Sequence, residues 1–538
     1  MDLKAENLVD LIKQASVHFS DKNGFSCHGI LLSYLDCYKY ANYLANYLKY
    51  DMGIKKGDRV AIMMPNLLQY PIAIFGVLLA GGVVVNLNPM DKAPCLKREL
   101  EQSEAKAIIV LEHFVAEINK LLSIKTKNLK IIITKIGDCY PFFKAVLYNF
   151  VTKFVKHQVP KYKPSKYLLA NKLAWKKAIK NGKILNKKIN IKIKPDDLAF
   201  LQFTGGTTGE PKAVMLSHFN ILANLDQCYE WVKDVFIHDQ EIVVTPLPLY
   251  HIFALVANLL LFIKIGGLNI LITNPRDLNS FIKSIKNIKF NVISGVNTLY
   301  KILLNNDKFK NLDFSSLTLA IAGGMKLDKN IADKWKKITG VYMTQGYGLT
   351  ETSPVISICP VNEKFNGSAG KLLKNTKMKI LGNKKKGEIL IKGPQVMQGY
   401  WKNQETTNKV LDKNGWLKTG DYGYLDKHGY LYILDRVKDI IIVSGFNVCA
   451  SEVEEVILEI KGISEVAVTR ISDKDSGEVV CAHVVLENNS KTNRDLMKSK
   501  IHKYTYEKLA AYKTPKKIVF HKDLPKSNLG KVLKKDLK

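Results

Sequence analysis

The chain has 538 residues, 46% of them hydrophobic, and a formal net charge of +32. This length is too great for one compact core, and the apolar fraction is too high for a disordered chain, so we expect two or three globular domains. The excess charge is almost all lysine and is spread along the chain without an aromatic–basic RNA motif or a zinc finger, which favours a solvated surface and argues against a nucleic-acid partner.

The first residues and the cysteines bear on the compartment. The stretch "MDLKAENLVDLIKQ" lacks the basic-then-apolar pattern of a signal peptide, and none of the eight cysteines forms a CxxC pair. We therefore expect a cytoplasmic protein with free thiols. The longest apolar runs, 71–87 and 252–263, are shorter than the roughly 20 residues of a membrane helix and are expected to be core elements.

From residue 57 the chain alternates between two kinds of pattern. Residues 57–90 read as a β-rich run, a turn and a buried helix, and further short apolar runs followed by turn residues lie at 130–135, 198–203, 242–247, 268–273, 290–295 and 317–324. Strands that alternate with helices predict a mostly parallel α/β architecture.

Residues 141–163 form a basic amphipathic segment. Phe143, Val146, Phe150 and Phe154 recur at helical spacing with lysines between them. Such a helix can lie on an anionic membrane, and the alternative is a helix that packs against the protein. We expect it to make peripheral contact with the inner face of the cell membrane.

The stretch "TGGTTGEPK" at 204–212 lies between two apolar runs. Glycines let the backbone turn tightly and point N–H groups at an anion, and threonine hydroxyls add donors. Glu210 and Pro211 separate the last glycine from Lys212, and "AVMLSH" after it is strand-like, so a Walker A loop and a GxGxxG fingerprint are both excluded. A polar hairpin turn is the alternative, but three glycines with three threonines favour a phosphate-binding loop between two strands.

The last third of the chain has shorter strands and closer turns. "GEILIKGP" and "GYLYILDR" indicate a β-rich subdomain at about 370–437, and the remainder predicts an α+β domain with helices near 452–459 and 493–509. We therefore expect an N-terminal domain over 1–437 that includes the β-rich subdomain, and a small C-terminal domain over 438–538.

The stretch "FTGGTTGEPKAVMLSH" resembles the phosphate loop of the adenylate-forming superfamily, which comprises acyl-CoA synthetases, luciferases and peptide-synthetase adenylation domains. The further motifs follow in the superfamily's order, from residue 57 to the end: "TPLPLYHIFAL", "AIAGGM", "YMTQGYGLTETSP", "GEILIKGPQVMQGYW", "NGWLKTGDYGYLDKHGYLYILDRVKDIIIVSGFNVCASEVE", "YKTPKKIVF" and "LPKSNLGK". The wording of "LPLYHIFAL", "NGWLKTGD" and "VKDIIIVSGFNV" is most similar to bacterial long-chain fatty acid–CoA ligases.

The resemblance implies both a fold and a reaction. The implied fold is a large α/β domain with a β-rich subdomain and a small mobile α+β lid. In the implied reaction a fatty acid carboxylate attacks the α-phosphorus of ATP, giving acyl-AMP and pyrophosphate, and the thiol of CoA then gives acyl-CoA and AMP. The implied cofactor is Mg²⁺, and a homodimer is compatible with the resemblance although the sequence leaves the oligomeric state open.

The resemblance also implies the residues of a nucleotide site. Those that would bind ATP or AMP are Thr204, Gly205, Gly206, Thr207, Thr208, Gly209, Lys212, Gly323, Gly324, Gln345, Gly346, Tyr347, Gly348, Asp421 and Arg436. Within this set the 204–212 loop would hold the β- and γ-phosphates, Tyr347 would stack on the adenine, and Asp421 and Arg436 would bind the ribose hydroxyls. Arg436 stands in a chain that uses lysine for almost all of its cations, which hints that its planar guanidinium matters.

The implied catalytic residues are His251, Thr350, Glu351 and Lys531. Glu351 would bind Mg²⁺, to which a hard carboxylate oxygen is suited, with Thr350 beside it on a phosphate. Lys531 would bridge the carboxylate and the α-phosphate. His251 would lie where the acyl group and the adenylate meet, although a histidine in an apolar run is also typical of a core.

Between the two half-reactions the C-terminal domain would rotate about a hinge at Lys438. Lys531 would then leave the site, and the face around Gly445 would line the CoA tunnel. No insertion that would block this rotation is evident.

Three positions depart from the family pattern. Gly206 stands where serine is common, Ala213 where glycine is common, and Leu255 where some long-chain relatives have an aromatic gate. Alternatives to the ligase are an enzyme that stops at acyl-AMP or uses a carrier protein, a ligase of aryl or medium-chain acids, and a non-catalytic basic protein that binds membrane or nucleic acid. The intact catalytic and ribose residues argue against the last.

Overall fold

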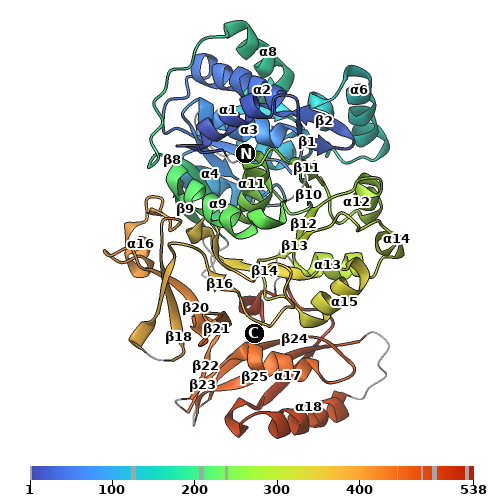
Figure 1. The fold of residues 1–538 in the computed structure, drawn as a ribbon, viewed down its shortest axis with the longest axis vertical. Helices are drawn as coiled ribbons and strands as arrows, with labels where there is room; N and C mark the ends of the chain where they lie inside the picture. The colour runs from blue at the N-terminus through green and yellow to red at the C-terminus, as the bar shows by residue number, and fades with distance from the viewer. Residues whose placement is uncertain are drawn as a thin grey trace. The chain divides into compact units, whose positions relative to one another are not determined.

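The computed structural model describes residues 3–122, 129–204, 211–236, 240–383, 385–444, 446–473, 476–487, 494–526 and 532–537. They belong to two compact units: unit 1 is Met1–Thr376 with Gly393–Gly415, and unit 2 is Lys377–Lys392 with Trp416–Lys538 (Figure 1). The segment 393–415 is therefore part of unit 1 although both of its flanks are part of unit 2. This division differs from the boundary expected at 437/438, which stays a prediction.

The first sheet of unit 1 has eight strands. They are β3 (Arg59–Met63), β4 (Val83–Asn86), β5 (Ala107–Leu111), β6 (Lys130–Thr134), β7 (Lys172–Ala174), β8 (Leu198–Thr204), β9 (Lys212–Ser217) and β19 (Gly399–Tyr400). Their order is β19-β9-β8-β4-β3-β5-β6-β7, and β3 to β8 are paired in parallel. β9 is antiparallel to β8 and to β19, so 204–212 does connect two adjacent strands, as predicted.

The second sheet of unit 1 has nine strands. They are β1 (Asn23–Cys27), β2 (Ile30–Ser33), β10 (Ile242–Thr245), β11 (Leu268–Leu271), β12 (Val292–Gly295), β13 (Leu319–Ala322), β14 (Met343–Gly348), β15 (Val355–Ile358) and β16 (Lys371–Leu372). The order is β16-β15-β14-β13-β12-β10-β11-β1-β2, with the central strands parallel. The predicted, mostly parallel α/β architecture is confirmed.

Helices connect these strands. The α-helices of unit 1 are α1 (Leu8–His18), α2 (Tyr34–Asn46), α3 (Gln69–Leu79), α4 (Ala93–Ser103), α5 (Val115–Leu122), α6 (Phe142–Phe150), α7 (Lys166–Asn171), α8 (Trp175–Leu185), α9 (His218–Val232), α10 (Ile252–Ala254), α11 (Leu261–Lys264), α12 (Leu278–Ile285), α13 (Asn297–Leu304), α14 (Asp307–Lys310), α15 (Lys329–Thr339) and α16 (Gln404–Val410). Short 3-10 and π-helical turns supplement them: η1 (Tyr47–Asp51), η2 (Glu112–Phe114), η3 (Ile136–Cys139), η4 (Val151–Val155), η5 (Lys233–Val235), η6 (Leu255–Leu260) and η7 (Thr350–Thr352).

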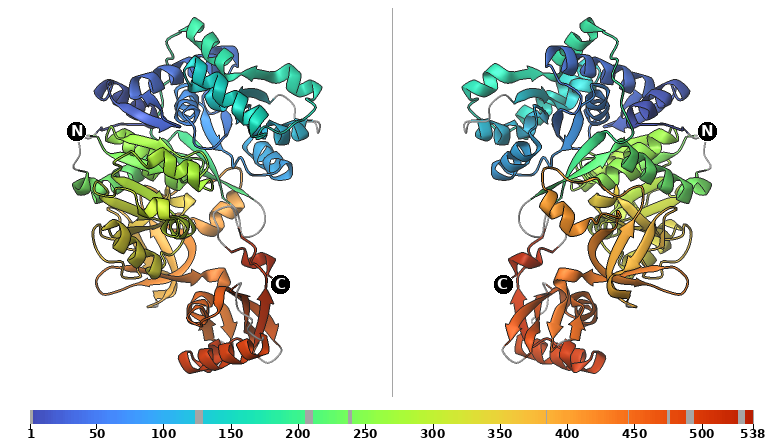
Figure 2. Two further views of the ribbon diagram at one scale, coloured as in Figure 1. Left: turned by 90° about the vertical axis from the view of Figure 1, so that its right-hand side faces the viewer. Right: turned by 90° about the vertical axis from the view of Figure 1, so that its left-hand side faces the viewer.

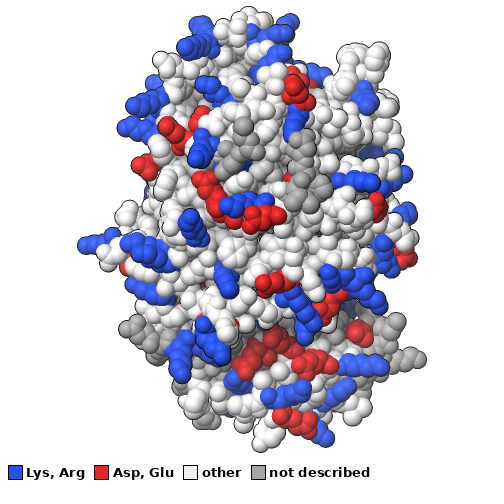
Figure 3. All heavy atoms as spheres, viewed as in Figure 1, with Lys and Arg blue, Asp and Glu red and all other residues white. Residues whose placement is uncertain are grey.

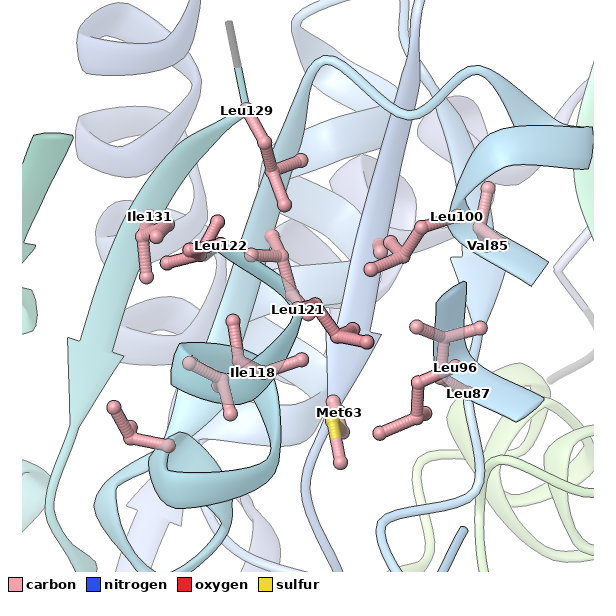
Figure 4. Packing of buried hydrophobic residues seen from close by; sticks show 14 of the residues in the cluster. Met63, Val85, Leu87, Leu96, Leu100, Ile118, Leu121, Leu122, Leu129 and Ile131 are labelled. Carbon is pink, nitrogen blue, oxygen red and sulfur yellow. The ribbon is translucent and has the colours of Figure 1, made fainter. Parts of the chain in front are cut away.

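The core of the eight-stranded sheet illustrates why these residues fold in this way. Parallel strands are covered on both faces, and "VAIM" and "AIIVL" are accordingly continuous hydrophobic runs. On one face, Leu96 of α4 and Leu121 of α5 pack against Met63, Val85 and Ile131 of the strands, and all five side chains are buried (Figure 4).

Unit 2 contains two sheets. β17 (Lys377–Ile380), β18 (Gly387–Lys392), β20 (Leu417–Leu425) and β21 (Leu431–Arg436) form an antiparallel sheet in that order. β22 (Ile441–Val443), β23 (Phe446–Val448), β24 (Ile463–Asp473), β25 (Gly477–Leu486) and β26 (Lys517–His521) form the other sheet, against which α17 (Ala450–Leu458) and α18 (Arg494–Lys508) pack (Figure 2). The remaining turns are η8 (Leu381–Asn383), η9 (Val437–Asp439), η10 (Ala511–Lys513) and η11 (Lys534–Asp536).

The core of the five-stranded sheet comes entirely from the end of the chain. Ile441, Val453, Val468, Ala482 and Ile501 are buried together. This is the small α+β domain expected from the sequence.

Candidate active site

The predicted residues of unit 1 lie at the carboxyl ends of parallel strands. Thr204 ends β8, residues 246–251 follow β10, Gly323 and Gly324 follow β13, and 345–348 end β14. Because β10, β13 and β14 are parallel members of one sheet, their ends lie along the same edge, which is where α/β proteins bind their ligands.

The ends of the predicted phosphate loop are held together by the sheet. Thr204 pairs with Lys212, and the Thr204 hydroxyl lies 3.5 Å from the Lys212 carbonyl oxygen. Gly205, Gly206, Thr207, Thr208 and Gly209 lie outside the described residues. Ala213 lies in β9 without a positive φ, so an alanine is accommodated where the family often has glycine.

Tyr400 connects the end of this loop to Glu351. It lies in β19, where Tyr400 pairs with Val214 of β9, and its hydroxyl donates a 2.8 Å hydrogen bond to Glu351 Oε1. Lys212 Nζ lies 5.3 Å from the centroid of the Tyr400 ring, within the range of a cation–π contact. Burial and the neighbouring carboxylate raise the pKa of Tyr400, so its hydroxyl remains a donor.

Sequence reasoning missed Tyr400. The residue stands in the quoted motif "GEILIKGPQVMQGYW", but a tyrosine in a strand is more often a packing residue. Its position in a family motif was the available signal. The partner of its hydroxyl is evident only once β19 is placed beside β9.

The turn that carries Thr350 and Glu351 is closely built. The Met397 N–H donates to the Glu351 carbonyl at 2.9 Å, and the Leu349 N–H donates to the Pro354 carbonyl at 2.9 Å. A Cβ on Gly348 would lie 1.8 Å from that Pro354 oxygen, so only glycine fits there. Glu351 therefore projects from a backbone that is fixed on both sides.

The predicted adenine residues have different surroundings. The Gln345 side chain is buried and engaged within the protein: its Oε1 accepts from the Leu327 N–H and its Nε2 donates to the Ser368 carbonyl at 3.1 Å. Gly346, Tyr347 and Gly348 are only partly buried.

The glycines after β13 have separate roles in the backbone. A Cβ on Gly323 would lie 2.9 Å from the Phe253 ring, so the glycine lets an aromatic side chain of the predicted acyl motif approach. Gly324 has a φ of +76°, a conformation that favours glycine.

His251 lies on a turn that is attached to the eight-stranded sheet by buried hydrogen bonds. Gln202 Nε2 donates to the Tyr250 carbonyl, Asn86 Nδ2 donates to Gln202 Oε1 at 3.1 Å, and the Tyr70 hydroxyl donates to Asn86 Oδ1 at 2.8 Å. Burial lowers the pKa of His251 to about 4. The imidazole is therefore neutral at physiological pH and suited to hydrogen bonding rather than to ion pairing.

The apolar run 252–263 is a core element, as predicted, but it is not one regular helix. Between α10 and α11 the π-helical turn η6 brings Asn258 into the interior. Asn258 Nδ2 donates to the Thr245 hydroxyl at 3.1 Å, and its Oδ1 accepts from the Ser294 hydroxyl at 2.9 Å. Leu255, where an aromatic gate occurs in some relatives, is fully buried.

Unit 2 brings together the two residues predicted to bind ribose. Asp421 and Arg436 face each other across β20 and β21, and Arg436 Nε lies 2.9 Å from the Asp421 carboxylate. Arg436 Nη1 also donates to the Thr419 carbonyl at 3.2 Å, so the guanidinium is held at two points. Lys438 lies in η9, whereas Gly445 and Lys531 lie outside the described residues.

Two family models match the chain. The AMP-binding enzyme model matches residues 12–401, and the model of the AMP-binding enzyme C-terminal domain matches residues 452–531. The chain belongs to the AMP-binding enzyme family. The motifs on which the resemblance rested are therefore those of a true member, and the adenylate-forming superfamily is confirmed.

Relatives of this AMP-binding enzyme align over almost its whole length. The long-chain-fatty-acid–CoA ligase of Escherichia coli O6:H1 is 42% identical over 99% of this chain and 94% of the relative. The ligase of the same name from Bacillus subtilis is 36% identical over 100% of this chain and 95% of the relative.

Solved structures share the fold. The anthranilate CoA ligase AuaEII, in complex with anthranoyl-AMP, has a TM-score of 0.82 at 22% identity over 99% of this chain and 97% of its own. ATP-bound MatB from Rhodopseudomonas palustris has a TM-score of 0.81 at 25% identity, over 99% of this chain and 98% of its own.

One further observation concerns membranes. Within the part of the chain that the structure describes, no helix of this AMP-binding enzyme is both long and apolar enough to cross a bilayer.

Proposed function

We propose that this protein is an ATP-dependent, AMP-forming long-chain fatty acid–CoA ligase. It converts a fatty acid to acyl-AMP with release of pyrophosphate and then transfers the acyl group to CoA. The observation that carries the proposal is the similarity of the whole chain to curated long-chain-fatty-acid–CoA ligases, at 42% identity for that of Escherichia coli O6:H1. ATP and CoA are thus its co-substrates.

For the first half-reaction, we infer that Lys212 and the 204–212 loop hold the β- and γ-phosphates while Glu351 binds Mg²⁺. The donor set fits this ion, because Glu351 supplies a hard oxygen and Mg²⁺ takes few protein ligands. Tyr400 donates to Oε1 of Glu351, which leaves Oε2 as the oxygen for the ion. When bound, Mg²⁺ would neutralise charge on the phosphates.

The remaining site residues have proposed roles in binding and orientation. Tyr347 would stack on the adenine between Gly323, Gly324 and the 345–348 strand end, and Thr350 would contact a phosphate. Neutral His251 would donate or accept a hydrogen bond where acyl group and adenylate meet, since burial lowers its pKa to about 4.

Unit 2 would supply the ribose contacts and the second half-reaction. Asp421 can accept hydrogen bonds from the ribose hydroxyls. Arg436 Nε, 2.9 Å from Asp421 Oδ1, holds the Asp421 carboxylate in place. Lys531 would stabilise the charge that develops between the carboxylate and the α-phosphate. A hinge at Lys438 would then exchange Lys531 for the face around Gly445, which would line the path of CoA.

The test is a panel of carboxylates of increasing length, with AMP and thioester measured separately. A long-chain ligase forms both products in equal amounts with long-chain acids. AMP or acyl-AMP without thioester would identify an acyl-AMP ligase or a carrier-protein synthetase. Preference for aryl or medium-chain acids would refute the substrate class but not the reaction.

We further propose that α6 and η4 bring the enzyme to an anionic membrane. Seven large apolar side chains there are between 55% and 86% exposed: Phe142, Phe143, Val146, Leu147, Phe150, Phe154 and Val155. Burying such a side chain in an apolar phase is worth about 1.5–3 kcal/mol. α6 lies at the margin of unit 1 (Figure 1), where a bilayer could reach it.

The charge of the segment selects an anionic surface. Residues 141–163 contain five lysines and no acidic residue. Each lysine near such a surface contributes about 1 kcal/mol. Elsewhere on the viewed face, lysine and arginine are interspersed with acidic residues (Figure 3).

Sedimentation with vesicles tests the membrane proposal. Phe143→Ser with Phe154→Ser should lower binding to phosphatidylglycerol vesicles, and neutral vesicles should bind less protein. The matched control is Ile184→Ser, which changes an exposed apolar side chain outside this segment, in α8. This variant should bind vesicles as the unmodified protein does. Equal binding of both variants would contradict the proposal.

A homodimer is proposed from the family resemblance alone. Sedimentation equilibrium should then give about twice the chain mass of 60.7 kDa, and the single-chain mass would refute it.

A further inference from the structure

Three side chains that can bind metal lie together at the start of α4, and none of them has been given a role above. Cys95 and Glu99 are four residues apart in α4, a spacing that places them on one face of the helix, and Asp91 precedes Lys92, the N-cap of α4. An oxygen of Asp91, the Cys95 sulfur and an oxygen of Glu99 all lie within 4.8 Å of one another. No other trio of potential ligands is so close within the described residues.

Glu99 supplies an independent observation that points to a ligand. Its side chain is 5% exposed, and its Oε2 atom is buried without a hydrogen-bond partner among the described residues. No ion pair within the described part of the chain involves Glu99, and the exposed neighbour Arg98 acts on its carboxyl group through charge without contacting it as an ion pair. A buried carboxylate normally requires a hydrogen bond, an ion pair or a metal.

We propose that Asp91, Cys95 and Glu99 bind a borderline-soft divalent cation, with Zn²⁺ as the best match. One thiolate with two carboxylates is a donor set that suits Zn²⁺ and disfavours Mg²⁺, which prefers oxygen ligands only. Asp91 and Cys95 are partly exposed, so water can reach the fourth position.

The geometry requires only small movements. Tetrahedral Zn²⁺ bonds of about 2.3 Å to sulfur and about 2.1 Å to oxygen put neighbouring ligand atoms about 3.5 Å apart. Changes in the side-chain torsion angles would bring the three ligand atoms, which now lie within 4.8 Å of one another, to this separation. Asn88 Nδ2 already donates to Asp91 Oδ1 at 2.9 Å, an outer contact that orients a carboxylate ligand.

The inference does not rest on the proposed function, and it is tested by direct binding. The full-length protein would be titrated with Co²⁺, a spectroscopic substitute for Zn²⁺, in the presence of excess Mg²⁺. We expect one equivalent to bind with a cobalt–thiolate charge-transfer band in the near ultraviolet, and loss of the band on addition of Zn²⁺.

Variants identify the ligands. Cys95→Ser should abolish the band, and Glu99→Gln should weaken Co²⁺ binding by at least about tenfold, the factor that loss of an outer-shell partner alone can cost. Cys449→Ser changes another partly buried thiol and should keep the band. Circular dichroism checks that each variant is folded.

Two results would overturn the inference. One is the absence of a thiolate band in the unmodified protein. The other is a band that survives in folded Cys95→Ser protein, which would place the metal on another cysteine.

Discussion

Replacing Tyr400 with phenylalanine tests whether this residue positions Glu351. The substitution removes only the hydroxyl that donates to Glu351 Oε1 at 2.8 Å, and it keeps the ring on which Lys212 Nζ lies. A hydrogen bond to a charged group contributes about 1.5–3 kcal/mol. At about 1.4 kcal/mol for each tenfold change, its loss corresponds to about a 10- to 150-fold effect.

The effect should fall on the Mg²⁺ dependence of acyl-AMP formation. The assay is ATP–pyrophosphate exchange at saturating fatty acid over a Mg²⁺ titration, which reports the first half-reaction alone. We expect Tyr400→Phe to lower the exchange rate, to raise the half-saturating Mg²⁺ concentration, or both, by a combined factor in that range. Thioester formation from supplied acyl-AMP should change much less.

A double-variant cycle distinguishes positioning from a general loss of structure. If Tyr400 acts through Glu351, adding Tyr400→Phe to Glu351→Gln should change the exchange rate little, because the two effects are coupled. Fully additive effects, or a Tyr400→Phe enzyme within twofold of the unmodified one at every Mg²⁺ concentration, would refute the reasoning.

Three further predictions concern catalysis and stability. Lys531→Ala should lower acyl-AMP formation by at least about 100-fold while sparing thioester formation from supplied acyl-AMP, and equal losses in both assays would exclude its bridging role. His218 has its pKa lowered to about 4 by burial, and its Nδ1 accepts from the Leu8 N–H at 3.2 Å. Histidine in the unfolded chain binds a proton more tightly than His218 does in the folded protein, so acid favours unfolding. The contribution of neutral His218 to the free energy of unfolding is therefore present above pH 6.5 and is lost as the pH falls towards 4. From pH 7 to pH 5 this loss is about 2 kcal/mol. Urea unfolding of His218→Gln should show a pH dependence smaller by that amount, whereas the exposed His157→Gln should retain it in full. Leu121→Ala, in the core of Figure 4, should lower the free energy of unfolding by about 2–5 kcal/mol, and a loss below about 1 kcal/mol in urea titrations would mean that the site collapses around the smaller side chain.

Local patterns were sufficient to predict the strands that end at the site. The run 198–203 became β8 with one more residue, Thr204, and the loop after it does lead into an antiparallel partner. The run 242–247 became β10, which ends at Thr245. These elements are buried on both faces, so hydrophobic runs and turn residues mark their ends.

Other features depend on partners that are distant in sequence. The interruption of 252–263 at Asn258 depends on Thr245 and Ser294, which an apolar pattern does not reveal. Gln345 was expected to face the nucleotide, and that role stays a prediction; the structure finds its amide bonded to Leu327 and Ser368. A motif identifies which residues matter, but the atom that each side chain contacts depends on packing.

The position of residues 393–415 in unit 1 affects how the protein can be divided into fragments. A fragment that starts at Trp416 would contain β20 and β21 without β18, the strand that pairs with β20. Its unpaired strand edge would invite association with other chains. A fragment that starts at Lys438 would keep the five-stranded sheet and its buried core together. Expression of the C-terminal region as a separate protein should therefore succeed from Lys438 and fail by aggregation from Trp416.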